Sequence, residues 1–309
     1  MKQVRVFAPA TVANLGCGFD VMGLAIDEPG DELVLAFNDR KKLVIKEISG
    51  DEGKLSYDPK KNTSTVAIQS MLDELKSKQG FDIVLKKKMP LGSGLGSSAA
   101  SSVAGVFAAN ILLKKPFSKT ELVRFAMQGE KVASGAAHAD NVAPCMLGGI
   151  ILIRSYHPLD IVQLPAPKNL YLIVVHPHVE VLTKDARAVL KKNVPMDVAI
   201  QQWGNTAALT AGLFRNDLKL VGRSVEDHVA EPYRAVLIPH FEKVKKAAFE
   251  NGAIACSISG SGPSIFAMCD GKSKTKKIAE AMRKIFSHNK IKSEGYISAV
   301  NKSGVKIIS

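Results

Sequence analysis

Apolar and polar residues alternate along several short stretches of the first 90 residues, which predicts a strand-rich beginning of the chain. Val, Ile, Leu and Phe recur at every second position there, and Gly, Asp or Pro bound the stretches, as is typical of β-strands. We predict strands at 3–7, 32–37, 43–48 and 81–86. Between them, apolar residues in 64–78 recur near the helical period, and Gly80 follows as a helix stop.

The next stretch predicts two consecutive helices, followed by a mixed second half. Residues 97–113 are rich in Ala and other small residues, and Ser118 with Glu121 forms a capping box that opens a helix over 119–132. Later apolar runs predict four further strands, three further helices and a pair of strands near the end. These strands are at 147–154, 170–176, 253–258 and 264–268, and the helices are at 184–192, 197–214 and 241–251. The pattern is that of an α+β protein.

Length and composition indicate an enzyme-sized globular protein. At 309 residues the chain has room for two domains, and the stretch from Pro165 to Pro167 is the best place for the chain to cross between them. We predict domains at 1–160 and 161–309. Hydrophobic residues make up 46% of the chain, yet no window reaches the roughly 18 apolar residues that a membrane helix needs. The beginning has no apolar signal region either, so we expect a cytoplasmic protein without membrane contact.

Charge and cysteines narrow the class of partner. The net charge of +13 raises the possibility of nucleic-acid binding, but the basic residues are spread along the chain. The densest runs, such as 86–88, are typical of solvated surface, so we expect a small-molecule substrate and no nucleic acid. The four cysteines have no metal-binding spacing and are predicted to be reduced and mostly buried.

A glycine-rich segment between a predicted strand and an Ala-rich helix carries the strongest chemical signal. Glycines at alternate positions let backbone amides approach an anion, and the start of the following helix adds its free N–H groups. We predict a phosphate-binding loop made of Pro90, Leu91, Gly92, Ser93, Gly94, Leu95, Gly96, Ser97, Ser98, Ala99 and Ala100. The plainer alternative is a tight turn with a helix cap. The spacing excludes a Walker A loop, because Ser97 and Ser98 stand where that motif has Gly and Lys, and it disfavours a dinucleotide fold.

The same segment, PLGSGLGSSAASS, resembles a signature motif of the GHMP kinases. Two further segments fit that family in the right order: PATVANLGCGFD at 9–20 and ISGSGPS at 258–264. Within the family, ANLGCGFD, HADNVAP at 138–144 and ISGSGPS are most similar to the motifs of homoserine kinases. The resemblance implies a two-domain fold, with an N-terminal ribosomal-S5-like βαβ domain that binds ATP and a C-terminal ferredoxin-like α/β sandwich that completes the substrate site.

The resemblance also implies ATP and Mg²⁺ as cofactors and assigns residues to them. Ser98 and Glu130 match the positions that hold Mg²⁺, which prefers hard oxygen ligands. Asn62 and the basic run at 86–88 are candidates for the adenine side. Judged without the resemblance, Glu130 would be read as a solvated carboxylate on a helix.

For the substrate, the resemblance implies transfer of the ATP γ-phosphoryl group to the hydroxyl of L-homoserine, on the route to threonine. A zwitterion needs a guanidinium for its carboxylate and a carboxylate for its ammonium. The carboxylate clamp is assigned to Arg187 and Arg234. The rest of the substrate site is assigned to Asn14, Asp20, His138, Asp140, Asn141 and Gly260, with Asp140, Asn141 and Glu130 as catalytic residues. Taken singly, the arginines would be surface charges and His138 a structural histidine.

One departure from the family bears on mechanism. Mevalonate-kinase-like relatives carry a lysine in the first motif, whereas this chain has Thr11, Val12 and Ala13 there. Asp140 is then either a base or an anchor for the substrate ammonium, and we favour the anchor. The alternatives to a homoserine kinase are another GHMP kinase acting on a sugar or isoprenoid alcohol, a nucleic-acid-binding protein, and a binding protein without turnover. The oligomeric state stays open, a homodimer included.

Overall fold

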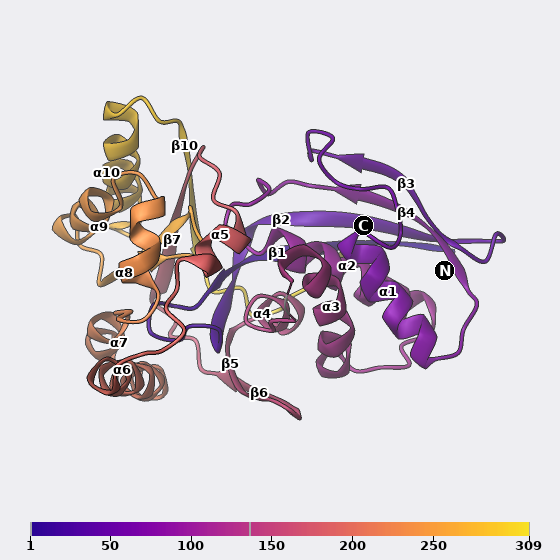
Figure 1. The fold of residues 1–309 in the computed structure, drawn as a ribbon, viewed down its shortest axis with the longest axis horizontal. Coiled ribbons are helices and arrows are strands. Elements are labelled where there is room, and N and C mark those ends of the chain that lie inside the picture. The colour runs from indigo at the N-terminus through magenta and orange to yellow at the C-terminus, as the bar shows by residue number, and fades with distance from the viewer. Residues whose placement is uncertain (1, 136, 309) are drawn as a thin grey trace.

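Two β-sheets form the frames of two lobes, which lie side by side in Figure 1. The computed structural model describes residues 2–135 and 137–308. The first sheet has the order β11-β1-β2-β4-β3, with β5 paired to β2 and β6 to β5. Its strands are β1 (Gln3–Ala13), β2 (Met22–Asn38), β3 (Leu43–Ser49), β4 (Gly80–Lys86), β5 (Ile150–Tyr156), β6 (Leu159–Leu164) and β11 (Lys306–Ile308). Among the strands of the described residues, only β3 and β4 pair in parallel, and the helix between them makes the crossover.

The helices of the first lobe pack on this sheet and closely against one another. They are α1 (Thr63–Glu74), α2 (Ser97–Leu112), α3 (Lys119–Ser134) and α4 (Val142–Leu147). Nearly all of α2 is buried, which explains its run of Ala and Ser. A Cβ on Gly129 would lie 2.4 Å from the carbonyl oxygen of Thr63 and 2.4 Å from Oγ of Ser102. Glycine at this position therefore lets α3 approach α1 and α2, and the next residue, Glu130, reaches the start of α2.

The second lobe is built on an antiparallel sheet of order β10-β7-β9-β8. Its strands are β7 (Leu170–Pro177), β8 (Ala255–Ile258), β9 (Ile265–Asp270) and β10 (Ser293–Ala299). Its helices are α5 (Thr183–Ala188), α6 (Met196–Arg215), α7 (Leu218–Ser224), α8 (Glu231–Arg234), a 3-10 turn (Ala235–Leu237), α9 (Phe241–Glu250) and α10 (Thr275–His288). A separate core with Ile173, Val244, Ile278 and Phe286 lies between the sheet and helices α9 and α10.

Most predicted elements exist, and the α+β class is confirmed. The prediction of a strand from 147 was wrong at its beginning, because α4 occupies Val142–Leu147 and β5 starts at Ile150. Helix α10 was not predicted, although its buried residues Ile278, Met282 and Phe286 follow the helical period. Frequent lysines between these residues obscured the apolar stripe.

The end of the chain returns to the first lobe. Strand β11 pairs with β1, with Arg5 opposite Ile308. The first lobe thus contains residues from both ends of the sequence, and its sheet runs on to Leu164. The division into 1–160 and 161–309 stays a prediction.

Two expectations about chemistry and environment concern the whole chain. All four cysteines are free and buried, as predicted. Among the described residues, no helix combines the length and apolarity needed to cross a bilayer.

Candidate active site

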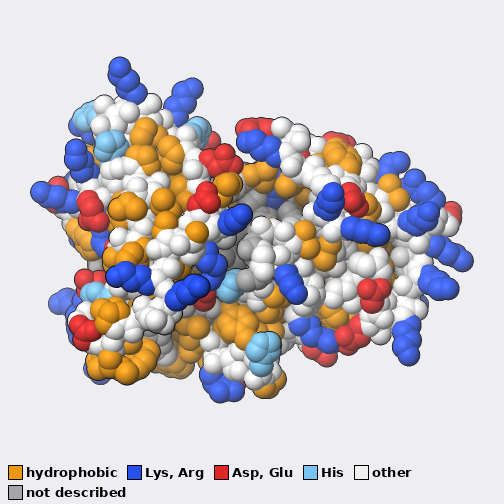
Figure 2. All heavy atoms as spheres, viewed as in Figure 1, with side chains coloured by type: hydrophobic (Ala, Val, Ile, Leu, Met, Phe, Trp, Pro, Cys, Tyr) orange, Lys and Arg blue, Asp and Glu red, His pale blue; other side chains and the backbone are white. Residues whose placement is uncertain are grey.

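A cavity of about 550 Å³ lies between the two lobes and brings the three sequence motifs together. Figure 2 shows the hollow between the lobes, with Lys and Arg side chains at its rim. Its walls come from the phosphate loop, the segments at 54–63 and 138–141, helix α3, the segment at 182–187, Arg234 and the loop at 260–261. Asn14, Asp20, His138, Asp140, Asn141, Arg187, Arg234 and Gly260, the residues predicted to form the substrate site, all line it.

The glycine-rich loop has the backbone of an anion site. Gly92, Gly94 and Gly96 have φ of +64°, +76° and +72°, in the left-handed region that favours glycine. Gly96 precedes the first residue of α2, and among the described residues no side chain caps this helix end, which borders the cavity through Ser97 and Ser98. Its first N–H groups are therefore available to an anion. Ser93 also lines the cavity, and its Oγ is buried with no hydrogen-bond partner in the described chain.

The predicted loop divides into residues that reach the cavity and residues that support them. Leu91, Gly92, Ser93, Gly94, Gly96, Ser97 and Ser98 line the cavity. Pro90, Leu95, Ala99 and Ala100 do not, and the last three are fully buried. Their small or apolar side chains seat the loop on the core.

Close contacts of two glycines join the loop to the other motifs. A Cβ on Gly94 would lie 2.4 Å from the carbonyl oxygen of Ser259, and Ser259 Oγ donates to the carbonyl of Gly94 at 2.7 Å. A Cβ on Gly96 would lie 2.1 Å from Oγ1 of Thr11. A side chain at Gly94 would therefore separate the loop from the second lobe as well as obstruct the approach of a phosphate.

The interpretation of the basic run at 86–88 as solvated surface was wrong for its central residue. Lys87 is buried, pairs with the buried Asp31, and donates from Nζ to the carbonyl of Ser97 and to Oγ of Ser101, both at 2.8 Å. Buried lysines need such partners to remain charged. Lys87 thus fastens the first turn of α2 to the sheet, a role that the sequence did not reveal because three adjacent lysines look alike.

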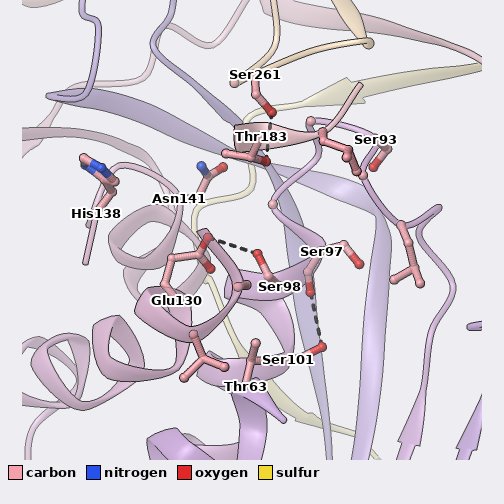
Figure 3. A pocket seen from close by; sticks show the side chains of 18 of the residues that line it. Thr63, Ser93, Ser97, Ser98, Ser101, Glu130, His138, Asn141, Thr183 and Ser261 are labelled. Atoms are coloured by element: carbon pink, nitrogen blue, oxygen red, sulfur yellow. Dashed lines mark hydrogen bonds between the residues drawn. The ribbon is translucent and has the colours of Figure 1, made fainter. Parts of the chain in front are cut away.

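Figure 3 shows Ser98, in the first turn of α2, facing Glu130 of α3. Ser98 Oγ donates to Oε1 of Glu130 at 3.0 Å, and burial raises the pKa of that carboxyl, opposed by Ser98 and Lys87. A buried carboxylate beside a phosphate loop favours a cation. Hydroxyl and carboxylate oxygens suit Mg²⁺, which keeps several waters and shares the phosphate oxygens, so the donor set fits this metal. Among the described residues no group of three or more His, Cys, Asp or Glu could hold a metal by itself.

Asn62 lines the cavity, but its side chain makes hydrogen bonds within the chain. Its Oδ1 accepts from the backbone N of Ser64 at 3.1 Å and its Nδ2 donates to the carbonyl of Ser56 at 3.1 Å. It caps α1, as its position before the helix favours. An adenine contact by Asn62 stays a prediction. Because the side-chain amide is already engaged, the backbone of Asn62 would have to make that contact.

Opposite charges are paired in the wall of the cavity. Arg187 donates from Nη1 and Nη2 to the two carboxylate oxygens of Asp20, both at 3.0 Å. Arg234 is buried and donates to the carbonyls of Ala186 and Gly260, at 2.9 and 3.0 Å. Both guanidinium groups lie over the ring of Phe19.

A tight turn presents Asp20 to this cluster. Asn14 and Asp20 have φ of +72° and +59°, a conformation that Asn and Asp tolerate better than most residues. Asn14 Oδ1 accepts from the backbone N of Asp20 at 3.0 Å, and its Nδ2 donates to the carbonyl of Gly260 at 2.9 Å. The Asn14 amide therefore ties the first motif to the third.

His138 borders the same cluster. Its Nδ1 lies 3.8 Å from Oδ2 of Asp20, and its buried Nε2 has no hydrogen-bond partner within the described residues. Burial lowers the pKa of His138, with Arg187 and Arg234 acting in the same direction and Asp20 opposing them, which favours the neutral imidazole. A buried polar atom at a cavity wall suits a ligand contact.

Asp140 and Asn141 stand between the charged cluster and the phosphate loop. Thr11 Oγ1 donates to Oδ1 of Asn141 at 2.6 Å, so the residue in the motif that lacks the lysine orients the Asn141 amide. Burial raises the pKa of Asp140 to about 7, with Asp20 and Glu130 adding to the shift and Arg187 opposing it.

This carboxyl predicts a dependence of stability on pH. Between its ordinary pKa of 3.8 and the folded value of about 7, the folded state keeps a proton that the unfolded chain releases. The stability that Asp140 contributes is therefore full at low pH and is lost as pH rises through about 7. We expect the melting temperature of Asp140→Asn, relative to that of the wild type, to rise by several degrees between about pH 5 and about pH 8.

The difference in melting temperature between the two proteins is measured because a second group also makes stability depend on pH. Burial lowers the pKa of His176 to about 4, so His176 gives a stability that rises with pH over part of the same range. His176 is present in both proteins and cancels in the comparison. A difference that stays constant with pH would contradict the raised pKa of Asp140.

Three more side chains support the site without having been predicted. Tyr156 donates from its hydroxyl to the carbonyl of Asp20 at 2.8 Å, and Thr183 and Ser261 lie 3.3 Å apart at the cavity wall. Ser261 lies within the motif at 258–264, a signal that could have found it, and Thr183 lies four residues before the predicted Arg187. Tyr156 stands on β5, where no local pattern marks it.

Comparisons with known proteins agree with this geometry. The GHMP kinase N-terminal domain matches residues 62–149, and the GHMP kinase C-terminal domain matches residues 209–288. Homoserine kinases of Chlorobium phaeobacteroides (strain DSM 266) and Chlorobaculum tepidum are 49% and 50% identical, over 100% of this chain and 100% and 99% of theirs.

Solved structures add to the agreement. The crystal structure of homoserine kinase from Cytophaga hutchinsonii is similar with a TM-score of 0.97 at 55% identity, covering 100% of this chain and 98% of that one. A mevalonate kinase of L. major shares the fold, with a TM-score of 0.71 at 18% identity over 95% of both chains. The resemblance predicted from three motifs is confirmed, and the chain belongs to the GHMP kinase family.

Proposed function

We propose that this protein transfers the γ-phosphoryl group of ATP to the hydroxyl of L-homoserine, giving O-phospho-L-homoserine on the route to threonine. The observation that carries the proposal is the Asp20–Arg187 pair, which lines the same cavity as the phosphate loop. A zwitterion presents one charge of each sign, so its carboxylate can take the guanidinium and its ammonium the carboxylates of Asp20 and Asp140. The full-length homoserine kinase relatives support the same substrate.

The reaction needs positioning and charge neutralisation more than a strong base. The bond from the γ-phosphorus to ADP breaks, a bond to the homoserine oxygen forms, and the hydroxyl proton is released. Loop amides and the start of α2 hold the phosphates, and Ser98 and Glu130 would hold Mg²⁺. Bound there, the metal neutralises negative charge on the phosphate oxygens.

The substrate hydroxyl is placed by the residues between the two subsites. Asn141, fixed by Thr11, offers its amide there, and His138 offers a buried ring nitrogen. With no lysine in the first motif, we assign Asp140 to the ammonium rather than to proton abstraction. Such a substrate interaction would favour the charged carboxylate and lower its pKa on binding.

An assay of ADP release across four candidate substrates tests the proposal. We expect rapid release with L-homoserine and far slower release with L-serine, L-threonine and mevalonate, because serine is one methylene shorter, threonine carries a secondary hydroxyl and mevalonate has no ammonium. Preference for mevalonate or for a sugar would replace homoserine with another GHMP-type substrate. We place the enzyme in the cytoplasm, where ATP is available.

A further inference from the structure

Tyr156 joins two segments of the substrate site that come from different sequence motifs. It is the last residue of β5. Its hydroxyl donates to the carbonyl of Asp20 at 2.8 Å and accepts from the backbone N of Ala139 at 3.2 Å. A phenol has one proton to donate and lone pairs to accept with, so a single oxygen serves both segments. The first sheet thus holds the turn at Asp20 and the segment around Ala139 through one side chain.

The segment around Ala139 depends on this contact because it lies outside regular structure. Residues 137–139 belong to no helix or strand. Ala139 is fully buried, so its backbone N–H needs a partner inside the protein, and the Tyr156 hydroxyl is that partner. The neighbours of Ala139 in the chain are His138 and Asp140. A bond to the residue between them therefore fixes the position of both side chains.

The turn at Asp20 is held from two directions. Its carboxylate accepts two hydrogen bonds from Arg187, which belongs to α5 of the second lobe. Its backbone carbonyl accepts the hydrogen bond from Tyr156 of the first sheet. The second lobe therefore orients the carboxylate, while Tyr156 fixes the backbone from which that carboxylate extends.

The ring and the protonation state of Tyr156 suit this role. The ring meets the imidazole of His138 edge-on, with centroids 6.3 Å apart and planes at 88°. Burial raises the pKa of Tyr156, and the charges of Asp140 and Asp20 add to the rise, whereas the bond from Ala139 and the charge of Arg187 oppose it. The phenol is therefore neutral near neutral pH and keeps the proton that it donates to the Asp20 carbonyl.

We propose that Tyr156 is a positioning residue for the amino-acid substrate, because its hydroxyl sets the separation between the Asp20 carboxylate and the segment at 137–140. The inference rests on the proposed function, in which the carboxylates of Asp20 and Asp140 take the ammonium of homoserine. One ammonium contacts both carboxylates only if their spacing is right, and a small displacement lowers affinity steeply. Tyr156 is not among the residues that line the cavity, so it acts through its neighbours rather than by touching the substrate.

Tyr156→Phe tests the role of the hydroxyl, because it removes one oxygen and keeps the ring beside His138. We expect the KM for L-homoserine to rise about 10-fold, since two backbone groups lose their partner. The KM for ATP should change less than about twofold, because Lys87 and Ser259 hold the phosphate loop. KM does not depend on the fraction of enzyme that is folded, so a modest loss of stability cannot imitate this result.

Tyr296→Phe is the matched control. The Tyr296 hydroxyl also donates a hydrogen bond, to Glu294 on the same strand, β10, and neither residue lines the cavity. This variant should leave the KM values for homoserine and ATP unchanged.

A double-mutant cycle separates positioning from general support of the fold. Asp20→Asn keeps the size of the side chain and removes the charge that Tyr156 is proposed to position. In this background we expect Tyr156→Phe to raise the KM for homoserine less than about threefold, in place of about 10-fold. A hydroxyl that merely stabilised the fold would have the same effect on KM in both backgrounds.

Four outcomes would overturn the proposal: an unchanged KM for homoserine in Tyr156→Phe, equal rises in the two KM values, the same factor in both backgrounds, or failure of the variant to fold. Failure of the proposed function has a different signature, because the wild type itself would then prefer another substrate to homoserine. In that case the KM of Tyr156→Phe is measured for the preferred substrate, and the same outcomes decide.

Discussion

Glu130→Gln is expected to lower kcat about 100- to 1,000-fold, the loss typical of removing one electrostatic contact to the transferring group. Glutamine keeps the size of the side chain and can still accept from Ser98, so the geometry at the start of α2 is preserved. What disappears is the negative charge that would hold Mg²⁺. We expect the remaining activity to need a higher Mg²⁺ concentration, measured in a titration of ADP release against the metal.

The stability of the same variant distinguishes catalysis from structure. Burial raises the pKa of Glu130, which means that its charged form is costly in the folded protein. Glu130→Gln should therefore melt at the wild-type temperature or above it near neutral pH. Glu74→Gln, at an exposed carboxylate of α1, is the control and should leave kcat unchanged. If the loss of activity followed a loss of melting temperature, Glu130 would be structural.

Arg187→Gln is expected to raise the KM for homoserine roughly 10- to 100-fold and to leave the KM for ATP almost unchanged. Arg187 is suited to this test because its side chain is 38% exposed and its hydrogen bonds run to Asp20 within the cavity. The preference for homoserine over an amino alcohol of equal length should become smaller in the variant. The amino alcohol has no carboxylate, so it loses no contact when Arg187 is removed. Arg154→Gln, which removes another arginine paired with an aspartate at the surface, serves as control.

Arg234 would give a less direct answer. It is buried and holds the carbonyls of Ala186 and Gly260, so its removal leaves two backbone acceptors without a donor. Loss of melting temperature in Arg234→Leu would then accompany any change in KM. If Arg187→Gln weakened homoserine and the amino alcohol equally, Arg187 would not be reading the carboxylate.

The residues that line the site were easier to predict from the sequence than the buried residues that hold them in place. Gly92, Gly94 and Gly96 need left-handed backbone, and such a need leaves a visible trace in sequence because one residue type satisfies it. The burial of Lys87 leaves no such trace. Its partner Asp31 lies 56 residues away, and only the register of β2 against β4 brings the two together.

The convergence of the charged residues was predicted only by resemblance. Asp20 and Arg187 are separated by 167 residues, and no pattern of periodicity or spacing relates them. The exposure of Trp203 and Phe214 on α6 was not predictable either. Their spacing predicted a helix correctly, but periodicity does not say which apolar residues of a helix the fold will cover.

The contact between Gly94 and Ser259 has a consequence for how the protein is made. The two residues are 165 positions apart, so a ribosome releases the phosphate loop long before the residue that braces it. Strand β11 comes later still, and until it emerges one edge of the first sheet stays open beside β1. A nascent chain that stops short of these segments would carry the full phosphate loop sequence with neither its brace nor its edge strand. Competence to bind nucleotide should therefore arise only when synthesis is nearly finished.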